Sequence, residues 1–228
     1  MLILGIDTSG KTASVALFDA DNEVFLAQTT IYTQKTHSQV IMPICKELIG
    51  QAGKQMSDIG AIAVANGPGS YTGLRIGVAA VKAMSFALGC KCCGVSTLEG
   101  LAFNNIAFRG TICAIMKARG ELVYTRTYKS DGYSLEPVSD EEIISRDALA
   151  EFLAFNGEEV LLCGDGAPEF FMTYQSKSFI IAPPAARLQN ACGICLAALS
   201  KNMTDAEKLE VSYLQKVKAE KDLEEKNK

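Results

Sequence analysis

The sequence predicts an α/β fold in two lobes, and three observations lead to this prediction. Short apolar segments that are typical of strands alternate with helical segments in both halves of the 228-residue chain. The first half opens with three strand-like segments joined by short turns, the pattern of a meander. The composition, with 48% hydrophobic and 21% charged residues, is that of an ordinary globular protein. We therefore expect one lobe over residues 1–106 and a second over residues 107–228.

The elements of the first half follow from apolar spacing and turn residues. Ala13, Val15 and Leu17 alternate on one face of a strand, whereas six apolar residues between 40 and 49 recur at helical spacing. Pro43 either follows the start of that helix or kinks it. Strands are expected at 2–6, 12–18, 23–30, 59–65 and 90–95, and helices at 38–50, 74–88 and 97–105.

The second half repeats this alternation of strands and helices less regularly. Strands are expected at 111–117, 121–128 and 159–163, and helices at 146–155 and 188–200. Residues 164–166 form a turn, and the chain from Ala206 onward is a polar tail of mixed charge.

Charge and composition restrict the cellular setting. The chain has 22 Lys and Arg against 26 Asp and Glu, a net charge of −4, so it lacks the broad positive field that nucleic-acid backbones attract. Any role on nucleic acid would run through a partner or a local patch. The start of the chain has no basic segment typical of a signal peptide, and no apolar run approaches membrane-spanning length. We expect a cytoplasmic protein without a membrane association, whose cysteines are reduced.

Residues 5–12 match the phosphate-loop pattern G-x-x-x-x-G-K-[ST] letter for letter. A phosphate loop must lead into a helix, but here Lys11 leads into an alternating strand, and Asp7 would repel a phosphate. The segment is better interpreted as a hairpin, with an Asp at the end of the first strand, as in actin-like ATPases and sugar kinases. Such enzymes need further phosphate loops, and residues 164–167 are either a remnant of one or an ordinary strand-to-helix turn.

A second motif, residues 66–77, joins a strand to a helix through two glycines around a proline. Ser70 or Thr72 can cap the helix, and the turn either binds an anion with the help of Arg75 or only sets the helix direction. The residues of a weak nucleotide or anion site would be Asp7, Ser9, Gly67, Gly69, Ser70 and Thr72. In the helix, alanines 79, 83 and 87 form a stripe that admits a second helix closely, for internal packing or for an interface.

Neither a metal site nor a catalytic set is expected. His37 is the only histidine, so the chain cannot form an HxxxH or HExxH pair, and we assign it to a helix start or a surface contact. The pattern Cys192-Gly193-Ile194-Cys195 falls within a helical segment among alanines, where packing explains it better than a redox or zinc site. We expect no catalytic residue, no metal and no cofactor.

At residues 67–77, Gly-Pro-Gly-Ser-Tyr-Thr-Gly-Leu-Arg-Ile-Gly, the sequence resembles the TsaB family, the dimerisation subunits of the bacterial tRNA threonylcarbamoyladenosine complex. The resemblance also covers residues 3–9, 36–38, Pro43, 118–124, 164–167 and 212–214. The sequence departs from the family at Lys117, where Asp is frequent, and at Gln215, where Arg is frequent.

The resemblance implies an actin-like two-lobed fold (the ASKHA class, with RNase H-like lobes). It also implies a non-catalytic scaffold subunit that activates a paralogous partner, TsaD. That partner carries the metal-binding HxxxH, binds nucleotide and transfers threonylcarbamoyl to the tRNA adenosine next to the anticodon. An ATPase, TsaE, joins the complex, tRNA reaches it through the complex, and without TsaD this chain would form a homodimer. The alternatives are an actin-like ATP-binding kinase or ATPase, a metallopeptidase, and a binding module for another partner.

Helices 38–50 and 74–88 are the expected dimer face. Its expected residues are His37, Ser38, Ile41, Cys45, Tyr71, Leu74, Arg75, Val78, Ala79, Lys82 and Ala83.

Overall fold

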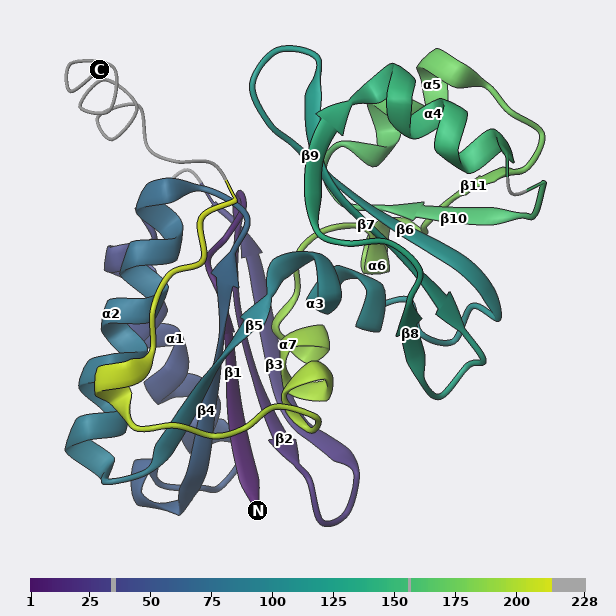
Figure 1. Ribbon diagram of the computed structural model, residues 1–228. Coiled ribbons are helices and arrows are strands. Elements are labelled where there is room, and N and C mark those ends of the chain that lie inside the picture. Colours follow the sequence, from purple (N-terminus) through teal and green to yellow (C-terminus); the bar gives the residue numbers. More distant parts are fainter. Residues whose placement is uncertain (34–35, 156, 215–228) are drawn as a thin grey trace, which may run out of the picture.

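The computed structural model describes residues 1–33, 36–155 and 157–214, which form two β-sheets with helices packed against them (Figure 1). The two-lobed α/β fold predicted from the sequence is confirmed. Of the helices in these three ranges, none combines the length and the apolar character that a membrane crossing needs.

The first sheet has five strands in the order β3-β2-β1-β4-β5. Its strands are β1 (Leu2–Asp7), β2 (Thr12–Asp19), β3 (Val24–Tyr32), β4 (Ile59–Gly67) and β5 (Lys91–Ser96). The strands β1 to β3 pair antiparallel, which confirms the meander, and β4 and β5 join parallel. β1 is buried along nearly its whole length because it is the central strand and both faces of the sheet are covered.

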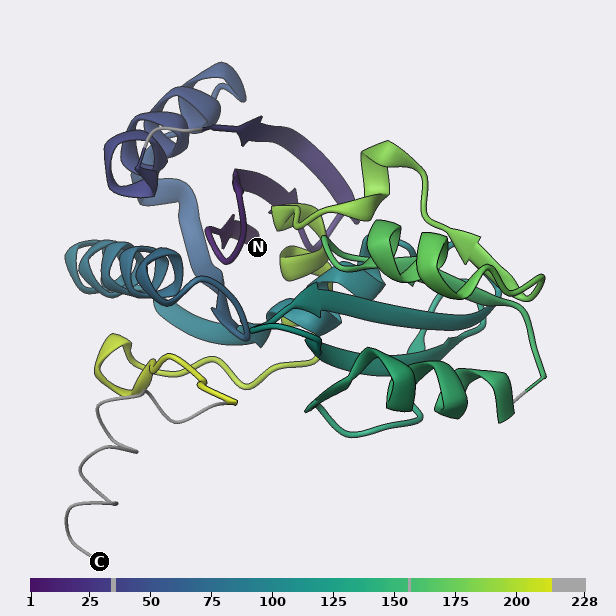
Figure 2. The ribbon, with the colours of Figure 1, turned by 90° about the horizontal axis from the view of Figure 1, so that it is seen from above.

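Helices cover both faces of this sheet. On one face lie α1 (His37–Gln51) and α2 (Tyr71–Leu88), while α7 (Ala191–Ala198) packs on the other, next to α3 (Thr97–Phe103) (Figures 1 and 2). Pro43 lies within α1, which begins six residues before it as one helix. A short 3-10 helix, η1 (Met56–Asp58), leads into β4. The apolar side chains of α1 and α2 pack on Leu4, Ile6 and Val64 of the sheet.

The second sheet has six strands, with the order β11-β10-β6-β7-β8 and with β9 also paired to β7. Its strands are β6 (Gly110–Lys117), β7 (Leu122–Ser130), β8 (Leu135–Pro137), β9 (Glu142–Ser145), β10 (Val160–Cys163) and β11 (Phe179–Ile181). Helices α4 (Arg146–Phe155) and α5 (Ala167–Tyr174) pack on one face, and α3 and the short α6 (Pro184–Arg187) on the other. If β9 is left out of the count, the second sheet read from β8 to β11 has the same order as the first, 3-2-1-4-5 in chain order within the lobe.

The chain returns to the first lobe after completing the second. The two sheets divide near residue 106, yet α7 packs on the first sheet, as does the segment that we call the C-terminal strap, residues 200–214. The strap, which includes the 3-10 helix η2 (Ala206–Lys208), runs beside α2 (Figure 2). The lobe boundaries 1–106 and 107–228 stay a prediction.

The part of the strap from Ala206 onward was expected to belong to a polar tail. Instead, Thr204 pairs with Cys92 of β5 through two backbone hydrogen bonds of 2.8 and 2.9 Å, and the Ser212 amide donates to the Asn66 carbonyl at 2.7 Å. Leu209 is buried in the hydrophobic core between the first sheet and the helices α1 and α2. Residues 215–228, with the predicted departure at Gln215, lie outside the described residues.

Candidate functional site: the α1–α2 face and the cleft between the sheets

Four residues that the sequence assigned to a partner interface lie in the protein core. Ile41, Cys45, Leu74 and Val78 are between 0% and 6% exposed, because they form the sides of α1 and α2 that face the first sheet. Burial also raises the pKa of the Cys45 thiol to about 12. They hold the two helices in place, and a partner cannot reach them without unfolding the lobe.

The opposite side of α2 is open to solvent and is built from small and aromatic residues. We call the exposed surface of α1, α2 and the adjoining strap the α1–α2 face. On α2 it contains Tyr71, Arg75, Ala79, Ala83 and Phe86, of which Phe86 is 83% exposed. The alanines leave the helix backbone accessible, while Tyr71 and Phe86 provide larger apolar surfaces near its two ends.

The remaining predicted interface residues lie at the border of this face. Ser38 is exposed at the first turn of α1, whereas His37 and Lys82 are half-buried. His37 is the first residue of α1, as expected for a helix start, and its ring lies close to Gly73 of α2. Burial lowers the pKa of His37, so the imidazole is neutral near pH 7.

Two glycines bring α2 against the turn between β1 and β2. A Cβ atom at Gly73 would overlap the Thr8 carbonyl oxygen, and one at Gly77 would overlap the Thr8 hydroxyl. The Thr8 hydroxyl donates to the Gly73 carbonyl at 2.8 Å, and the Ser70 hydroxyl accepts from the Gly73 amide at 3.2 Å. Ser70 is therefore the N-cap, and α2 begins at Tyr71, three residues earlier than predicted, so Thr72 lies inside the helix.

Tyr71, Arg75 and Tyr213 form one cluster on the α1–α2 face. The Tyr71 and Tyr213 rings stack with centroids 5.3 Å apart, and the Arg75 guanidinium lies 4.1 Å from the Tyr71 centroid. Arg75 Nε donates to the Tyr213 hydroxyl at 3.0 Å. Tyr213 of the strap therefore fixes the side chain of Arg75 on α2. The sequence did not predict this contact because Tyr71 and Tyr213 are far apart in the chain.

The predicted anion site is brought together only in part. The Asp7 carboxylate is buried and accepts from the Ser9 amide at 2.9 Å and from the Ser9 hydroxyl at 2.6 Å, while the Ser70 amide donates to the Ser9 carbonyl. Gly69 lies directly against Ser9. Gly67 instead contacts the strap at Ser212, and the side chain of Thr72 is exposed.

A cleft of about 380 Å³ opens next to this turn, between the two sheets. One side of the cleft is formed by the β1–β2 turn and the residues before α2, and the other side by residues at or just after the ends of β6 and β10 and by Tyr124 of β7. The lining residues are Ser9, Gly10, Lys11, Gly69, Ser70, Met116, Lys117, Ala118, Arg119, Tyr124 and Asp165. β2 begins at Thr12, directly after Lys11, which confirms that residues 5–12 form a hairpin. The Lys11 side chain lines this cleft, and the element that follows Lys11 in the chain is a strand and not the helix that a phosphate loop requires.

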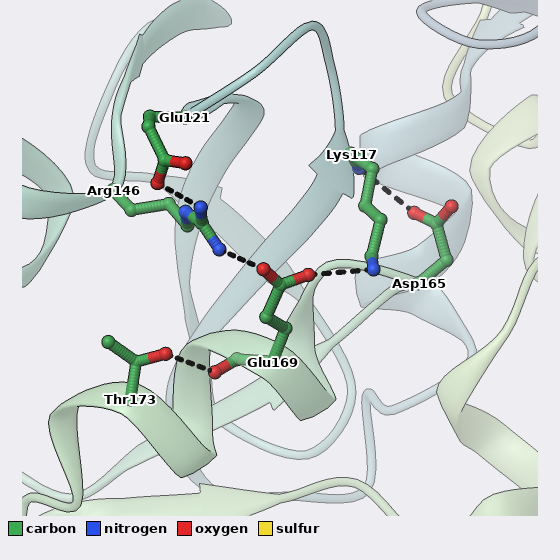
Figure 3. A network of polar contacts seen from close by, with 6 residues as sticks. All are labelled: Lys117, Glu121, Arg146, Asp165, Glu169 and Thr173. Carbon is green, nitrogen blue, oxygen red and sulfur yellow. Dashed lines mark hydrogen bonds and ion pairs between the residues drawn. The ribbon is translucent and has the colours of Figure 1, made fainter.

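On the second lobe, a chain of charged groups borders the cleft (Figure 3). Glu169 of α5 pairs with Lys117 at 2.7 Å and with Arg146, which also pairs with Glu121. Both cations lower the pKa of Glu169. Asp165 accepts from the Lys117 amide at 3.1 Å, and burial raises the pKa of its carboxyl. The sequence did not predict this network because its members come from three segments that are far apart in the chain, residues 117–121, 146 and 165–169.

Residues 164–167 make the strand-to-helix turn that was one of the two interpretations of this segment. Gly164 has a φ of 98°, a conformation that favours glycine, and its amide donates to the Arg187 carbonyl at 2.6 Å. The Gly166 amide donates to the Ile115 carbonyl, so the turn is tied to β6. α5 begins directly after it, at Ala167.

Two groups of cysteines lie close together in the sequence, Cys192 and Cys195 on α7 and Cys90, Cys92 and Cys93 at β5, and all of them are buried or half-buried. Cys195 is fully buried between α7 and the first sheet, and burial raises the pKa of Cys192 to about 11 and of Cys93 to about 12. Within the described ranges, no group of three or more His, Cys, Asp and Glu side chains could hold a metal ion.

The buried Asp7 carboxyl gives a prediction about pH and stability. Burial raises the pKa of Asp7 above its ordinary value, so folding favours the protonated form and wild-type stability is lost as pH rises through the folded pKa. An Asn at this position still accepts both bonds from Ser9. We expect the Tm of Asp7→Asn to exceed that of wild type at pH 8 by more than at pH 4.5, as measured by calorimetry. The exposed substitution Asp140→Asn is the control. A difference in Tm that does not change with pH would contradict this prediction.

Fold and site together define the class of protein. Two lobes with the same sheet order and a cleft between them form an actin-like fold. Two solved structures share it over nearly the whole chain. An uncharacterised Pseudomonas aeruginosa protein similar to the peptidase YeaZ has a TM-score of 0.81 and 23% identity, covering 94% of this chain and 99% of that one. YeaZ from Pseudomonas aeruginosa has a TM-score of 0.79 and 24% identity, covering 93% and 99%.

Sequence comparisons identify the family. The protein-family sequence model described as TsaD, tRNA N6-adenosine threonylcarbamoyltransferase, matches residues 26–226 of this chain. The tRNA threonylcarbamoyladenosine biosynthesis protein TsaB of Bacillus subtilis is 38% identical over 165 residues, which are 72% of this chain and 71% of that protein. TsaB of Escherichia coli is 32% identical over 63% of this chain and 64% of that protein. The chain belongs to the TsaB family.

Proposed function

We propose that this chain is a non-catalytic scaffold subunit in tRNA threonylcarbamoyladenosine formation, which binds and activates a TsaD transferase through the α1–α2 face. TsaD would transfer the threonylcarbamoyl group to the tRNA adenosine next to the anticodon. TsaE would join this pair, tRNA would bind to the assembled complex, and two copies of this chain would pair through the same face when TsaD is absent.

The α1–α2 face is the single observation that carries this proposal. Its centre consists of the exposed alanines at 79 and 83, so another helix can pack close to the backbone of α2. Phe86 and Tyr71 are large side chains near its two ends, of the type that fills pockets on a partner. Four buried apolar residues beneath the face hold both helices rigid before any partner binds.

The similarity of this chain to both the TsaD and the TsaB families supports the proposal that its partner is a paralogue. The same chain matches the TsaD model over most of its length and aligns with TsaB proteins. A partner with the same lobe architecture would present a corresponding pair of helices, and a pseudo-symmetric pair of such faces would form a four-helix contact.

Reconstitution tests the proposed function. Purified TsaD and TsaE are combined with unmodified tRNA, ATP and a donor of the threonylcarbamoyl group, with and without this chain. We expect modification to need all components, and this chain alone to leave ATP and tRNA unchanged. Full modification in its absence would overturn the scaffold role. Turnover of ATP or of a peptide by the isolated chain would instead favour an actin-like ATPase or a peptidase.

A further inference from the structure

Arg75 is the one arginine on α2, and the structure holds its side chain in a defined position. The guanidinium lies over the Tyr71 ring, and its Nε is bonded to the Tyr213 hydroxyl. Nη1 and Nη2 have no ion pair within the described residues, and the cation interacts there with the two tyrosines alone. These two nitrogens form the planar fork that binds a carboxylate through two parallel hydrogen bonds.

The charge on α2 is of one sign. Its 18 residues contain Arg75 and Lys82 and no Asp or Glu. The acidic and basic side chains of α1 and the strap, which adjoin α2, are His37, Lys46 and Glu47 of α1 and Lys201, Asp205, Glu207, Lys208 and Glu210 of the strap. Of these, Asp205 pairs with Lys91 and Lys201 pairs with Glu99. Among the described residues, Lys82 Nζ donates to the Glu207 backbone carbonyl at 3.4 Å and forms no ion pair. A partner that covers α2 therefore meets a cationic helix around a centre of alanines.

We propose that Arg75, positioned by Tyr71 and Tyr213, is the specificity-determining contact of the α1–α2 face and binds a carboxylate on the docking helix of a paralogous subunit. This inference rests on the proposed function and adds the chemistry of the partner to it. The pre-formed position of the guanidinium reduces the side-chain entropy lost on binding, so the contact stabilises the complex more than a free arginine would.

The same contact discriminates against a second copy of this chain. In a symmetric pair, α2 faces α2, and each copy presents Arg75 and Lys82 without a carboxylate on that helix. Like charges across an interface are unfavourable, so the homodimer is weaker than the pair with an acidic helix. Salt screens both effects: it weakens the mixed pair and strengthens the homodimer.

The test measures both associations with the full chain. Isothermal titration gives the Kd for the purified TsaD paralogue, and sedimentation equilibrium gives the Kd of the homodimer, each at about 0.05 M and about 0.5 M NaCl. We expect Arg75→Gln to weaken the mixed pair about 10- to 100-fold and to remove most of its salt dependence. The homodimer should become equally tight or tighter. Tyr213→Phe, which keeps the stack on Tyr71 and loses the hydrogen bond, should weaken the mixed pair about 3- to 10-fold.

Arg109→Gln is the matched control, because Arg109 is also exposed and lies 6.0 Å from a tyrosine ring centroid, that of Tyr133, but belongs to the second lobe. It should leave both associations unchanged. Two results would overturn this inference alone. In the first, Arg75→Gln binds the paralogue with the same Kd as wild type; in the second, the substitution weakens the mixed pair and the homodimer by the same factor. Failure of the wild-type chain to bind the paralogue would overturn the proposed function.

Discussion

Ala83→Arg is expected to abolish co-purification with TsaD. Ala83 lies at the exposed centre of α2, where another helix would pack directly on the backbone. An arginine there places a long charged side chain between the two helices and leaves its charge without a partner in a closed contact. A buried unpaired charge costs several kcal/mol, which exceeds what most interfaces can lose without dissociating. Size-exclusion chromatography of the mixed subunits measures the result.

The control for this variant is Ala154→Arg, an exposed alanine on α4 of the second lobe. It introduces the same side chain on a helix that the proposed interface does not include, and it should elute with TsaD as the wild-type chain does. If Ala83→Arg still eluted as a complex, the α1–α2 face would not be the contact with TsaD. A normal melting curve for both variants would show that each is folded.

Gly193→Ala is expected to cause the largest loss of stability of the variants considered. Gly193 lies where α7 crosses α3, and a Cβ at this position would overlap the Gly100 carbonyl oxygen and lie 2.8 Å from Asn104 Oδ1. The Gly193 amide also donates to Asn104 Oδ1 at 2.7 Å. Gly100 lies in α3 and Asn104 is the C-cap of that helix, so α7 would have to move away from α3. Overpacking of this kind costs about 1–3 kcal/mol, which lowers the Tm by about 2–12 °C for a chain of this size.

Gly50→Ala is the matched comparison, because nothing lies within 4 Å of a Cβ at Gly50 in α1. Alanine favours a helix over glycine by about 0.5–1 kcal/mol, so this variant should melt at the same temperature as wild type or higher. Differential scanning calorimetry of the two variants separates close packing from helix propensity. Equal Tm values for Gly193→Ala and wild type would show that α3 and α7 can move apart without cost.

The elements with strong periodicity could be predicted from the sequence. The apolar alternation at residues 12–18 and the helical stripes of α1 and α2 gave elements whose ends agree with the structure to within three residues. The strands β8, β9 and β11 are three or four residues long, too short for any period to be visible. The helix α6 has four residues, and α5, with eight, spans little more than two helical turns.

For the proposed interface, the sequence predicted the two helices but not which of their side chains are exposed. A stripe of large apolar residues and a stripe of alanines run along α2, and spacing alone does not show which one faces the sheet. The larger residues Leu74 and Val78 fill the core, where they bury more surface, and this leaves the alanines outside. The strap gave no signal because backbone hydrogen bonds hold much of it in place, and these leave no mark on the pattern of side chains.

The return of the chain to its first lobe determines when that lobe can be completed during synthesis. Ile3, Ala16 and Val95 on one side of the first sheet are covered by Ile194 and Ala198, which leave the ribosome only after every strand of the second sheet. Until then α7 does not cover that apolar side of the nascent sheet, so the amino-terminal lobe cannot be completed as an independent unit. Translation must pass through every strand of the second sheet before α7 and the strap can complete the first lobe.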